Sequence, residues 1–409
     1  MPTIAVLGTL DTKGIEHAFV AERIRERGHQ TLLIDVGTGG PPQIRPDISR
    51  EDVAATGNLD LPSLMARADR GECVTAMAAA APKLLVRLCS EGRIDGVISL
   101  GGSGGTAIAS AAMRALPIGF PKLIVSTVAS GQTAHYVGTK DITMMPAIVD
   151  VCGLNRISRT IFCRAAGAIC GMVTASVGAE SAKPIIVASM FGNTTKCVSA
   201  AVRILEDAGY EVLVFHATGT GGRTMESLIE SGMVAGVLDI TTTELADELV
   251  GGVLSAGPDR VNAAARCGVP AIIVPGCLDM VNFGERQSVP AQFEGRNFVI
   301  HNPQITLMRT TPEECRKLGE TLAEKINRYR SPVTVLIPSR GISIISAQAG
   351  PFHDPAADAE LFDALTSGLN PEVKVISMDC EINAPEFAHA CAASLLENMH
   401  AHSPQDGPI

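Results

Sequence analysis

Short apolar runs alternate with longer helical patterns along this chain, and that alternation limits the fold more than any other feature. The run "TIAVLG" at residue 3 is followed by a helical pattern from Gly14 to Arg27 and then by "TLLIDVG". Strand, helix and strand in this order form a βαβ unit with parallel strands. The pattern resumes with "DGVISLGG" and "KLIVST". The sequence therefore predicts an α/β protein with doubly wound, mainly parallel sheets.

Four of these runs return in the same order in the second half of the chain. "IAVLGT" resembles "IVASMF", "TLLIDVGTGG" resembles "VLVFHATGTGG", "IDGVISL" resembles "VAGVLDI", and "PKLIVST" resembles "PAIIVPG". The order favours an internal duplication, although two unrelated Rossmann-like domains with generic strand sequences would look similar. Because 409 residues are too many for one ordinary core, either alternative predicts two Rossmann-like domains, residues 1–180 and 181–409.

Composition excludes several classes of function. The formal net charge is −10, only 3% of residues are aromatic, and no dense Lys/Arg cluster is present, so we expect no nucleic-acid partner. The N-terminal stretch lacks a basic segment followed by a long apolar one, and other apolar runs are short. We therefore expect a cytoplasmic protein without a membrane partner. The 11 cysteines form no C-x-x-C pair and are expected to be reduced.

The stretch "VISLGGSGGTAIASAAM" at residue 97 carries four glycines between a predicted strand and a predicted helix. Backbone N–H groups at a helix N-terminus attract anions, and glycines allow a ligand to approach closely. The stretch lacks a Walker lysine and fits a dinucleotide fingerprint only weakly. We expect a phosphate site here, with a glycine-rich packing turn as the alternative. Its predicted residues are Gly101, Gly102, Ser103, Gly104, Gly105 and Thr106.

Further candidates follow other strands, because ligands of doubly wound sheets bind beyond the carboxyl ends of the strands. The loops "GTLDTKG" and "DVGTGG" supply the predicted cofactor contacts Gly8, Thr9, Asp11, Lys13, Asp35 and Gly37. Lys13 is also a candidate catalytic group. The segment "GTKDITMMPAIVDVCGLNRISR" contributes Asp141 as another, and it either covers the ligand of the first domain or is a solvated linker.

The second half offers acid/base groups and arginines near predicted strand ends. An anion contact is expected at Arg340, with a plain surface arginine as the alternative, and Arg296 and Arg309 are similarly placed. The acidic residues could instead be helix caps, and a lone histidine is more often structural. No metal ligand set can be assigned. The catalytic candidates here are His216, Asp239, Glu244 and Asp279, with Glu226 and His301 as further acid/base groups or metal ligands.

Longer motifs carry a resemblance to a known family. "GTLDTKG", "GTKDITMMPAIVDVCGLNRISR", "LDITTTELADELVGG" and "PSRGISIISAQAGPFHDPAADAELFDAL" look like a largely uncharacterised bacterial family. That family is similar to the N-terminal ATP-binding domain of the tomato mosaic virus resistance protein, and the likeness runs along nearly the whole chain. The resemblance implies two Rossmann-like domains, ATP with Mg²⁺, and a homodimer or larger homo-oligomer. Because a TIM-barrel domain follows in the plant protein, it also implies a separately encoded TIM-barrel protein as a partner.

Three functions remain open at this point. The first is an ATP-dependent enzyme that acts on a small anionic metabolite between the two domains. The second is a nucleotide-binding regulatory module without turnover, favoured by the missing Walker lysine and the lack of an obvious general base. The third is a nucleotide-independent, metal-dependent enzyme of small-acid metabolism, which would use His216, Asp239 and Asp279.

Overall fold

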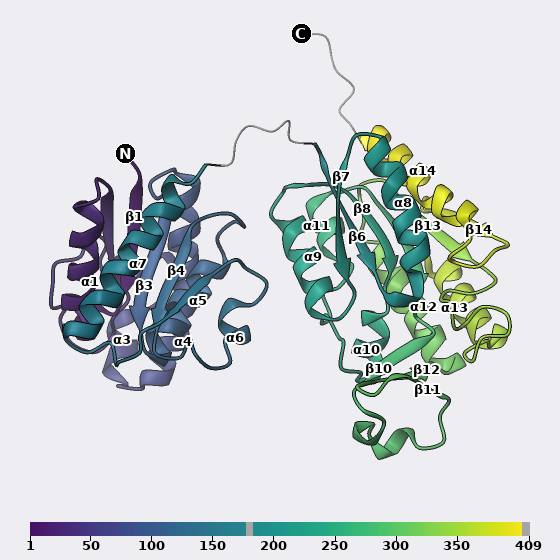
Figure 1. The fold of residues 1–409 in the computed structure, drawn as a ribbon, viewed down its shortest axis with the longest axis horizontal. Helices are drawn as coiled ribbons and strands as arrows, with labels where there is room; N and C mark the ends of the chain where they lie inside the picture. The colour runs from purple at the N-terminus through teal and green to yellow at the C-terminus, as the bar shows by residue number, and fades with distance from the viewer. Residues whose placement is uncertain (177–182, 403–409) are drawn as a thin grey trace, which may run out of the picture. The chain divides into compact units, whose positions relative to one another are not determined.

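The fold consists of two compact units, residues 1–179 and 180–409, each described here by itself. The computed structural model describes residues 1–176 and 183–402 (Figure 1). The predicted domain boundary at residue 180 lies outside the described residues.

Unit 1 is built on five parallel strands in the order β2-β1-β3-β4-β5. The apolar strand residues alternate between the two faces, which is the pattern of a sheet covered on both sides. Ala5 and Leu7 face one cluster, while Ile4 and Val6 face the other. The strands are β1 (Thr3–Gly8), β2 (Gln30–Asp35), β3 (Gly96–Gly101), β4 (Lys122–Ser126) and β5 (Thr143–Pro146).

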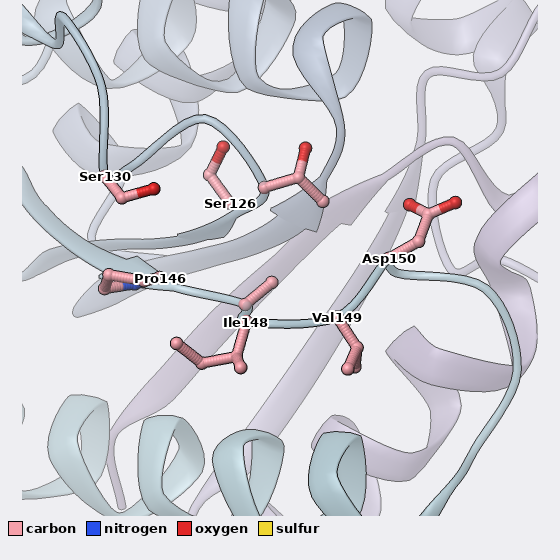
Figure 2. A pocket seen from close by; sticks show the side chains of 8 residues that line it. Ser126, Ser130, Pro146, Ile148, Val149 and Asp150 are labelled. Carbon is pink, nitrogen blue, oxygen red and sulfur yellow. The ribbon is translucent and has the colours of Figure 1, made fainter.

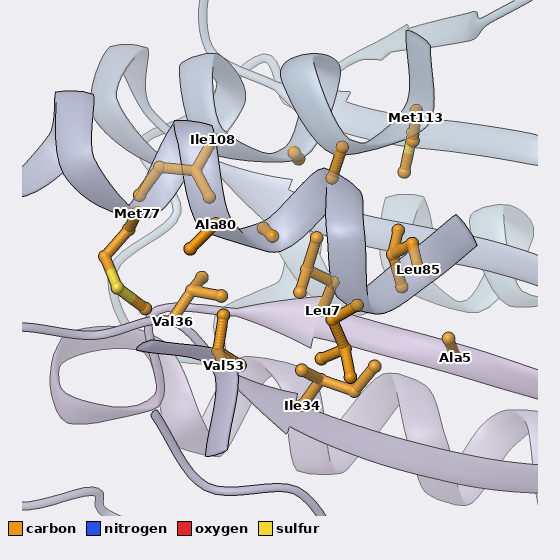
Figure 3. Close-up of a cluster of buried hydrophobic side chains, with 14 of the residues drawn as sticks. Ala5, Leu7, Ile34, Val36, Val53, Met77, Ala80, Leu85, Ile108 and Met113 are labelled. Carbon is orange, nitrogen blue, oxygen red and sulfur yellow. The ribbon is translucent and has the colours of Figure 1, made fainter. Parts of the chain in front are cut away.

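Helices cover both faces of this sheet. Figure 3 shows the cluster in which Met77 and Ile108 pack against Leu7 and Ile34. On the opposite face, Phe162 and other side chains of α1 and α7 pack together. The helices are α1 (Leu10–Arg25), α2 (Arg50–Thr56), α3 (Leu61–Ala66), α4 (Arg70–Ser90), α5 (Ser103–Arg114), α6 (Ala134–Val137) and α7 (Arg156–Thr174).

Helix α4 is apolar and 21 residues long, so by length and composition alone it could cross a membrane. No other helix in the described ranges passes that test. The buried side chains of α4, among them Met77, Leu84 and Leu88, belong to the core of unit 1. One such helix is weak evidence for a membrane span, since core helices have the same composition.

Unit 2 is built on six parallel strands in the order β14-β13-β9-β8-β6-β7, with a small antiparallel sheet β10-β12-β11 beside them. In Figure 1 the antiparallel strands lie at the lower end of this unit. The strands are β6 (Ile185–Met190), β7 (Glu211–His216), β8 (Val234–Thr241), β9 (Ala271–Gly276), β10 (Met280–Phe283), β11 (Phe298–Asn302), β12 (Ile305–Arg309), β13 (Val333–Pro338) and β14 (Lys374–Met378).

Helices also cover both faces of the six-stranded sheet, since one apolar cluster joins α8 with α14 and another joins α12 with α13. The helices are α8 (Thr195–Asp207), α9 (Thr220–Glu230), α10 (Glu244–Val250), α11 (Ala263–Cys267), α12 (Pro312–Ile326), α13 (Pro355–Gly368) and α14 (Pro385–His402), with short 3₁₀ turns at Gly192–Thr194, Arg286–Ser288 and Ala291–Phe293.

The predicted α/β fold with two largely parallel sheets is confirmed. The four repeated sequence runs form β1 and β6, β2 and β7, β3 and β8, and β4 and β9. Each pair occupies the same place in its sheet, because both orders read second, first, third and fourth strand. This correspondence fits both an internal duplication and two unrelated Rossmann-like domains, because doubly wound sheets share this strand order.

Candidate functional site

A cavity lies at the carboxyl edge of the sheet in unit 1, where the strand order reverses between β1 and β3. Strands diverge at such a switch point, and ligands of doubly wound sheets bind there. Its volume of about 710 Å³ is typical of small-molecule sites. The predicted residues that line it are Thr9, Asp11, Lys13, Gly102, Ser103, Gly104 and Gly105.

The glycine-rich stretch forms the N-terminus of α5 at this cavity. Gly102 is the N-cap and has an extended backbone conformation. Because glycine has no side chain, no side-chain capping hydrogen bond is made at this end of the helix. The first N–H groups of a helix have no partner within the helix, so those of Ser103 to Gly105 are available to a ligand. A Cβ atom on Gly104 would meet Val74 at 3.4 Å and Arg70 at 3.7 Å, so both side chains lie close to this backbone.

Asp11 brings a carboxylate to the same cavity. Its Oδ2 accepts a hydrogen bond from the N–H of Gly39 at 2.7 Å. Its Oδ1 is buried and has no hydrogen-bond partner among the described residues. A Cβ atom on Gly37 would lie 2.5 Å from the Asp11 carboxyl carbon, so this glycine makes room for the carboxylate. Asp11 therefore holds the second loop with one oxygen, while its other, buried oxygen has no partner among the described residues.

Lys13 and Asp150 connect the cavity to the segment after β5. The ammonium of Lys13 donates to the carbonyl of Val151. Asp150 lines the cavity and is exposed. It is one of the polar residues of the segment that the sequence associated with a ligand of the first domain. Arg70, at the start of α4, also lines the cavity, and no sequence motif marked it.

His17 is a further residue that sequence reasoning missed. It is fully buried, and its Nδ1 donates to the carbonyl of Lys13 at 2.7 Å. Its Nε2 accepts from the N–H of Leu100 at 3.4 Å, where pairing between β1 and β3 has ended. A Cβ atom on Gly8 would lie 2.0 Å from this nitrogen, so Gly8 makes room for the imidazole. Burial lowers the pKa of His17 and keeps the ring neutral.

Besides Gly8 and Gly37, three further predicted contacts support the cavity without lining it. Asp35 is buried and accepts from the N–H groups of Leu10 at 3.0 Å and Gly37 at 2.8 Å, which joins the loops after β1 and β2. Burial raises the pKa of Asp35. Thr106 is buried and bonds the hydroxyl of Ser126 at 2.7 Å. Gly101 ends β3, and a Cβ atom there would lie 3.2 Å from the Cα of Gly105.

Asp141 lies at the amino ends of the strands, whereas the cavity lies at their carboxyl ends. Its carboxylate pairs with the buried ammonium of Lys122 at 2.7 Å and accepts from the N–H of Gly119 at 2.9 Å. Lys122 begins β4 and Asp141 precedes β5, so both lie at the amino ends of their strands. Asp141 is therefore not brought to the cavity with the other candidates.

In unit 2, two catalytic candidates belong to a buried ion network around Arg260. This guanidinium is fully buried and contacts Asp239 at 2.6 Å, Glu244 at 2.6 Å and Glu226 at 3.2 Å. Oε1 of Glu244 also accepts from the N–H groups of Gly219 and Gly222. Although burial opposes the charge, the three carboxylates raise the pKa of Arg260 well above its ordinary value. These contacts give Asp239 and Glu244 a structural role.

Asp279 is also buried, and burial raises its pKa to about 6. Its Oδ2 accepts from the hydroxyl of Ser343 at 2.8 Å, and its Oδ1 has no hydrogen-bond partner in the described part of the chain. Arg309 lies near it and pairs with Asp358 at 2.6 Å. Asp279 follows β9, Ser343 follows β13, Arg309 ends β12 and Asp358 lies on α13. No hydrogen bond or ion pair between described residues joins them to the Arg260 network.

The remaining candidates of unit 2 lie on its surface or in separate ion pairs. His216 ends the edge strand β7, is exposed and contacts the ring of Phe191. Arg340 pairs with Asp379 at 2.5 Å, and its side chain is 62% exposed. Arg296 pairs with Glu314 at 2.7 Å. His301 is exposed on β11. Across residues 1–176 and 183–402, no group of three or more His, Cys, Asp or Glu side chains could hold a metal ion.

Comparison with known families decides where the chain belongs. Residues 2–178 match the N-terminal domain and residues 183–399 the C-terminal domain of an uncharacterised protein family, UPF0261. The chain belongs to the UPF0261 family. A UPF0261 protein of Clostridium tetani is 48% identical over 97% of this chain and 98% of its own length. The predicted family resemblance is therefore confirmed.

The UPF0261 chain is also similar to a plant protein. The ToMV resistance protein Tm-1(GCR237) of Solanum lycopersicum is 39% identical over 97% of this chain and 56% of the tomato protein. Among solved structures, UDP-N-acetylglucosamine 2-epimerase from Rickettsia bellii is 13% identical over 66% of this chain and 78% of that one. Its TM-score of 0.22 is too low to support a functional argument.

Proposed function

We propose that the protein binds ATP with Mg²⁺ in the cavity of unit 1 and uses it in a reaction on a small molecule. The observation that carries this proposal is that the uncapped α5 N-terminus lines the same cavity as Asp11, whose Oδ1 has no partner among the described residues. Backbone N–H groups attract phosphate oxygens, and a carboxylate beside them attracts the cation that accompanies the phosphates. A cavity for an uncharged metabolite would need neither.

The lining of the cavity combines polar and apolar residues, which suits a nucleotide. Thr9, Asp11 and Gly102 to Gly105 lie among its polar lining, whereas Val36, Met65, Val74 and Ile108 give it an apolar part. A flat base packs well against apolar side chains, and the glycines leave space for phosphates close to the backbone. Arg70 adds a positive charge that balances part of the phosphate charge.

Asp11 and Asp150 are the residues that would hold the magnesium ion. Mg²⁺ is usually bound by one or two carboxylates, phosphate oxygens and water, so two carboxylates beside a phosphate site are sufficient. Both residues line the cavity, and Oδ1 of Asp11 has no hydrogen-bond partner among the described residues. When bound, the magnesium nucleotide would supply an activated phosphoryl group. Lys13, whose ammonium donates to Val151, holds the segment that carries Asp150.

Calorimetry with Mg-ATP tests the proposal. Gly104→Val places a branched side chain at the phosphate position, where only Val74 and Arg70 lie within 4 Å, and should weaken binding at least tenfold in folded protein. The matched control is Ser103→Ala, which keeps the N–H row and should cost about 0.5 to 1.5 kcal/mol. If folded Gly104→Val protein bound Mg-ATP as tightly as the parent, the phosphate site would not be at α5.

A second candidate is a nucleotide-binding regulatory module without turnover. The observation that favours it concerns Lys13, which lines the cavity. Its ammonium already donates to the backbone carbonyl of Val151. Release of phosphate from ATP, measured with and without candidate small molecules, separates the two functions. An enzyme should show release that rises with its substrate. A regulatory module should bind Mg-ATP and release none.

A further inference from the structure

A second pocket adjoins the nucleotide cavity in unit 1. It has a volume of about 480 Å³ and lies at the carboxyl ends of β4 and β5. Thr127 and Asp150 line both this pocket and the cavity, so the two spaces meet at these residues. Its other lining residues are Ser126, Ser130, Pro146, Ala147, Ile148 and Val149.

The chemistry of this lining differs from that of the cavity. Hydroxyl groups of Thr127 and Ser130 and the carboxylate of Asp150 supply polar contacts, and none of the described lining residues is Lys or Arg. In Figure 2 the oxygens of Ser126, Ser130 and Asp150 lie above the chain from Pro146 to Asp150, and Val149 extends below it. In nucleotide-free protein the carboxylate of Asp150 can accept hydrogen bonds from hydroxyl groups, and the described lining of this pocket has no Lys or Arg that would attract an anion.

A strained turn holds this arrangement. The N–H of Val149 donates to the carbonyl of Ala147 at 2.7 Å, so Ile148 is the central residue of a γ-turn. Its φ is +64°, which is unfavourable for a β-branched residue. Ile148 is also 76% exposed, so burial in the core does not compensate for the strain. Such strain persists chiefly where the chain direction serves a site, and here the turn leads directly into Asp150.

We propose that this second pocket binds a neutral, hydroxyl-bearing small molecule beside the nucleotide. The ligand would donate its hydroxyl groups to Asp150 and exchange hydrogen bonds with Thr127 and Ser130. Its identity as the second reactant of the ATP-dependent reaction rests on the proposed function, whereas its binding does not. The anionic metabolite that the sequence predicts between the two domains stays a prediction, because this pocket lies within unit 1.

Saturation-transfer NMR on nucleotide-free protein tests the proposal. The probes are polyols of three to six carbons, from glycerol to sorbitol, each paired with its aldonic acid, from glycerate to gluconate. At least one polyol should receive saturation at a level several times that of its paired acid. Equal saturation of both classes, or none for any polyol, would overturn the proposal. Because no nucleotide is present, this result is independent of Mg-ATP calorimetry on the same protein.

Two variants locate the binding. Ser130→Leu fills the pocket and should reduce the polyol signal at least fivefold, whereas Gln132→Leu places the same side chain in the same loop outside the described lining and should not. Ile148→Gly relieves the strained turn, so the thermal midpoint should stay or rise while the polyol signal falls. A polyol signal that survives Ser130→Leu, or a midpoint lowered by Ile148→Gly, would count against the proposal.

Discussion

The Nε2 atom of His17 accepts a hydrogen bond from the backbone N–H of Leu100, across the point where β1 and β3 separate. The ladder between these strands ends at the pair Leu7 and Ser99, so the next N–H group needs another acceptor. The neutral imidazole supplies it. His17 thereby fixes the last residues of β3 directly before the glycine-rich stretch.

Gly8→Ala tests how closely this imidazole is packed. The added methyl would lie 2.0 Å from Nε2 of His17, so the side chain or strand must shift. We expect a loss of about 1–3 kcal/mol in the free energy of unfolding of unit 1. His17→Ala should cost less in the Gly8→Ala background than in the parent, because the methyl then has room. Gly40→Ala is the control, since no atom lies within 4 Å of its Cβ position. Denaturant titrations of the parent, the three single variants and the double variant provide the measurement.

Acidification should loosen the same contact. The pKa of His17 in the folded protein is below its ordinary value of 6.5, so on acidification the unfolded chain takes up the proton first. The stabilisation is therefore complete above pH 6.5 and is lost as pH falls toward the folded-state pKa. Hydrogen exchange of the Leu100 amide, corrected for its intrinsic pH dependence, should show falling protection in this window. Unchanged protection down to pH 5 would contradict this assignment of the imidazole.

Asp11→Asn should separate magnesium binding from phosphate binding. The amide can still accept the hydrogen bond from Gly39, but it removes the negative charge at Oδ1. We expect Mg-ATP to bind at least tenfold more weakly, while ATP in the presence of a chelator binds as well as to the parent or better. The reason is that the lost carboxylate repels phosphate when no cation is present. Equal loss under both conditions would show that Asp11 does not act through the metal.

Arg260→Met should reveal the structural role of the buried network. The change leaves the carboxylates of Glu226, Asp239 and Glu244 without their shared cation, at a cost of about 3–5 kcal/mol. Denaturant unfolding of unit 2 measures that loss. Mg-ATP affinity of protein that remains folded should match the parent, because the proposed site lies in unit 1. A stable variant with altered nucleotide affinity would contradict both assignments.

Sequence reasoning worked for the fold because strand periodicity and loop position are local properties. Thr9, Asp11 and Gly104 each follow a predicted strand, so the sequence predicted them together at the carboxyl ends of the strands, where they line one cavity. It could not find His17, whose role depends on Leu100, 83 residues away. Nor could it distinguish Glu244 as a partner of Arg260 from Glu244 as a catalytic base, since burial is set by packing between distant elements.

The tetrapeptide Gly-Thr-Gly-Gly occurs once in each unit, at residues 37–40 and 219–222. In both places an internal carboxylate accepts N–H groups of the turn, Asp11 in the first and Glu244 in the second. Glu244 uses its other oxygen to accept from Arg260, whereas the other oxygen of Asp11 has no partner among the described residues. Two turns of identical sequence thus differ in the carboxylate that holds them: in unit 2 both of its oxygens are satisfied within the unit, and in unit 1 only one is.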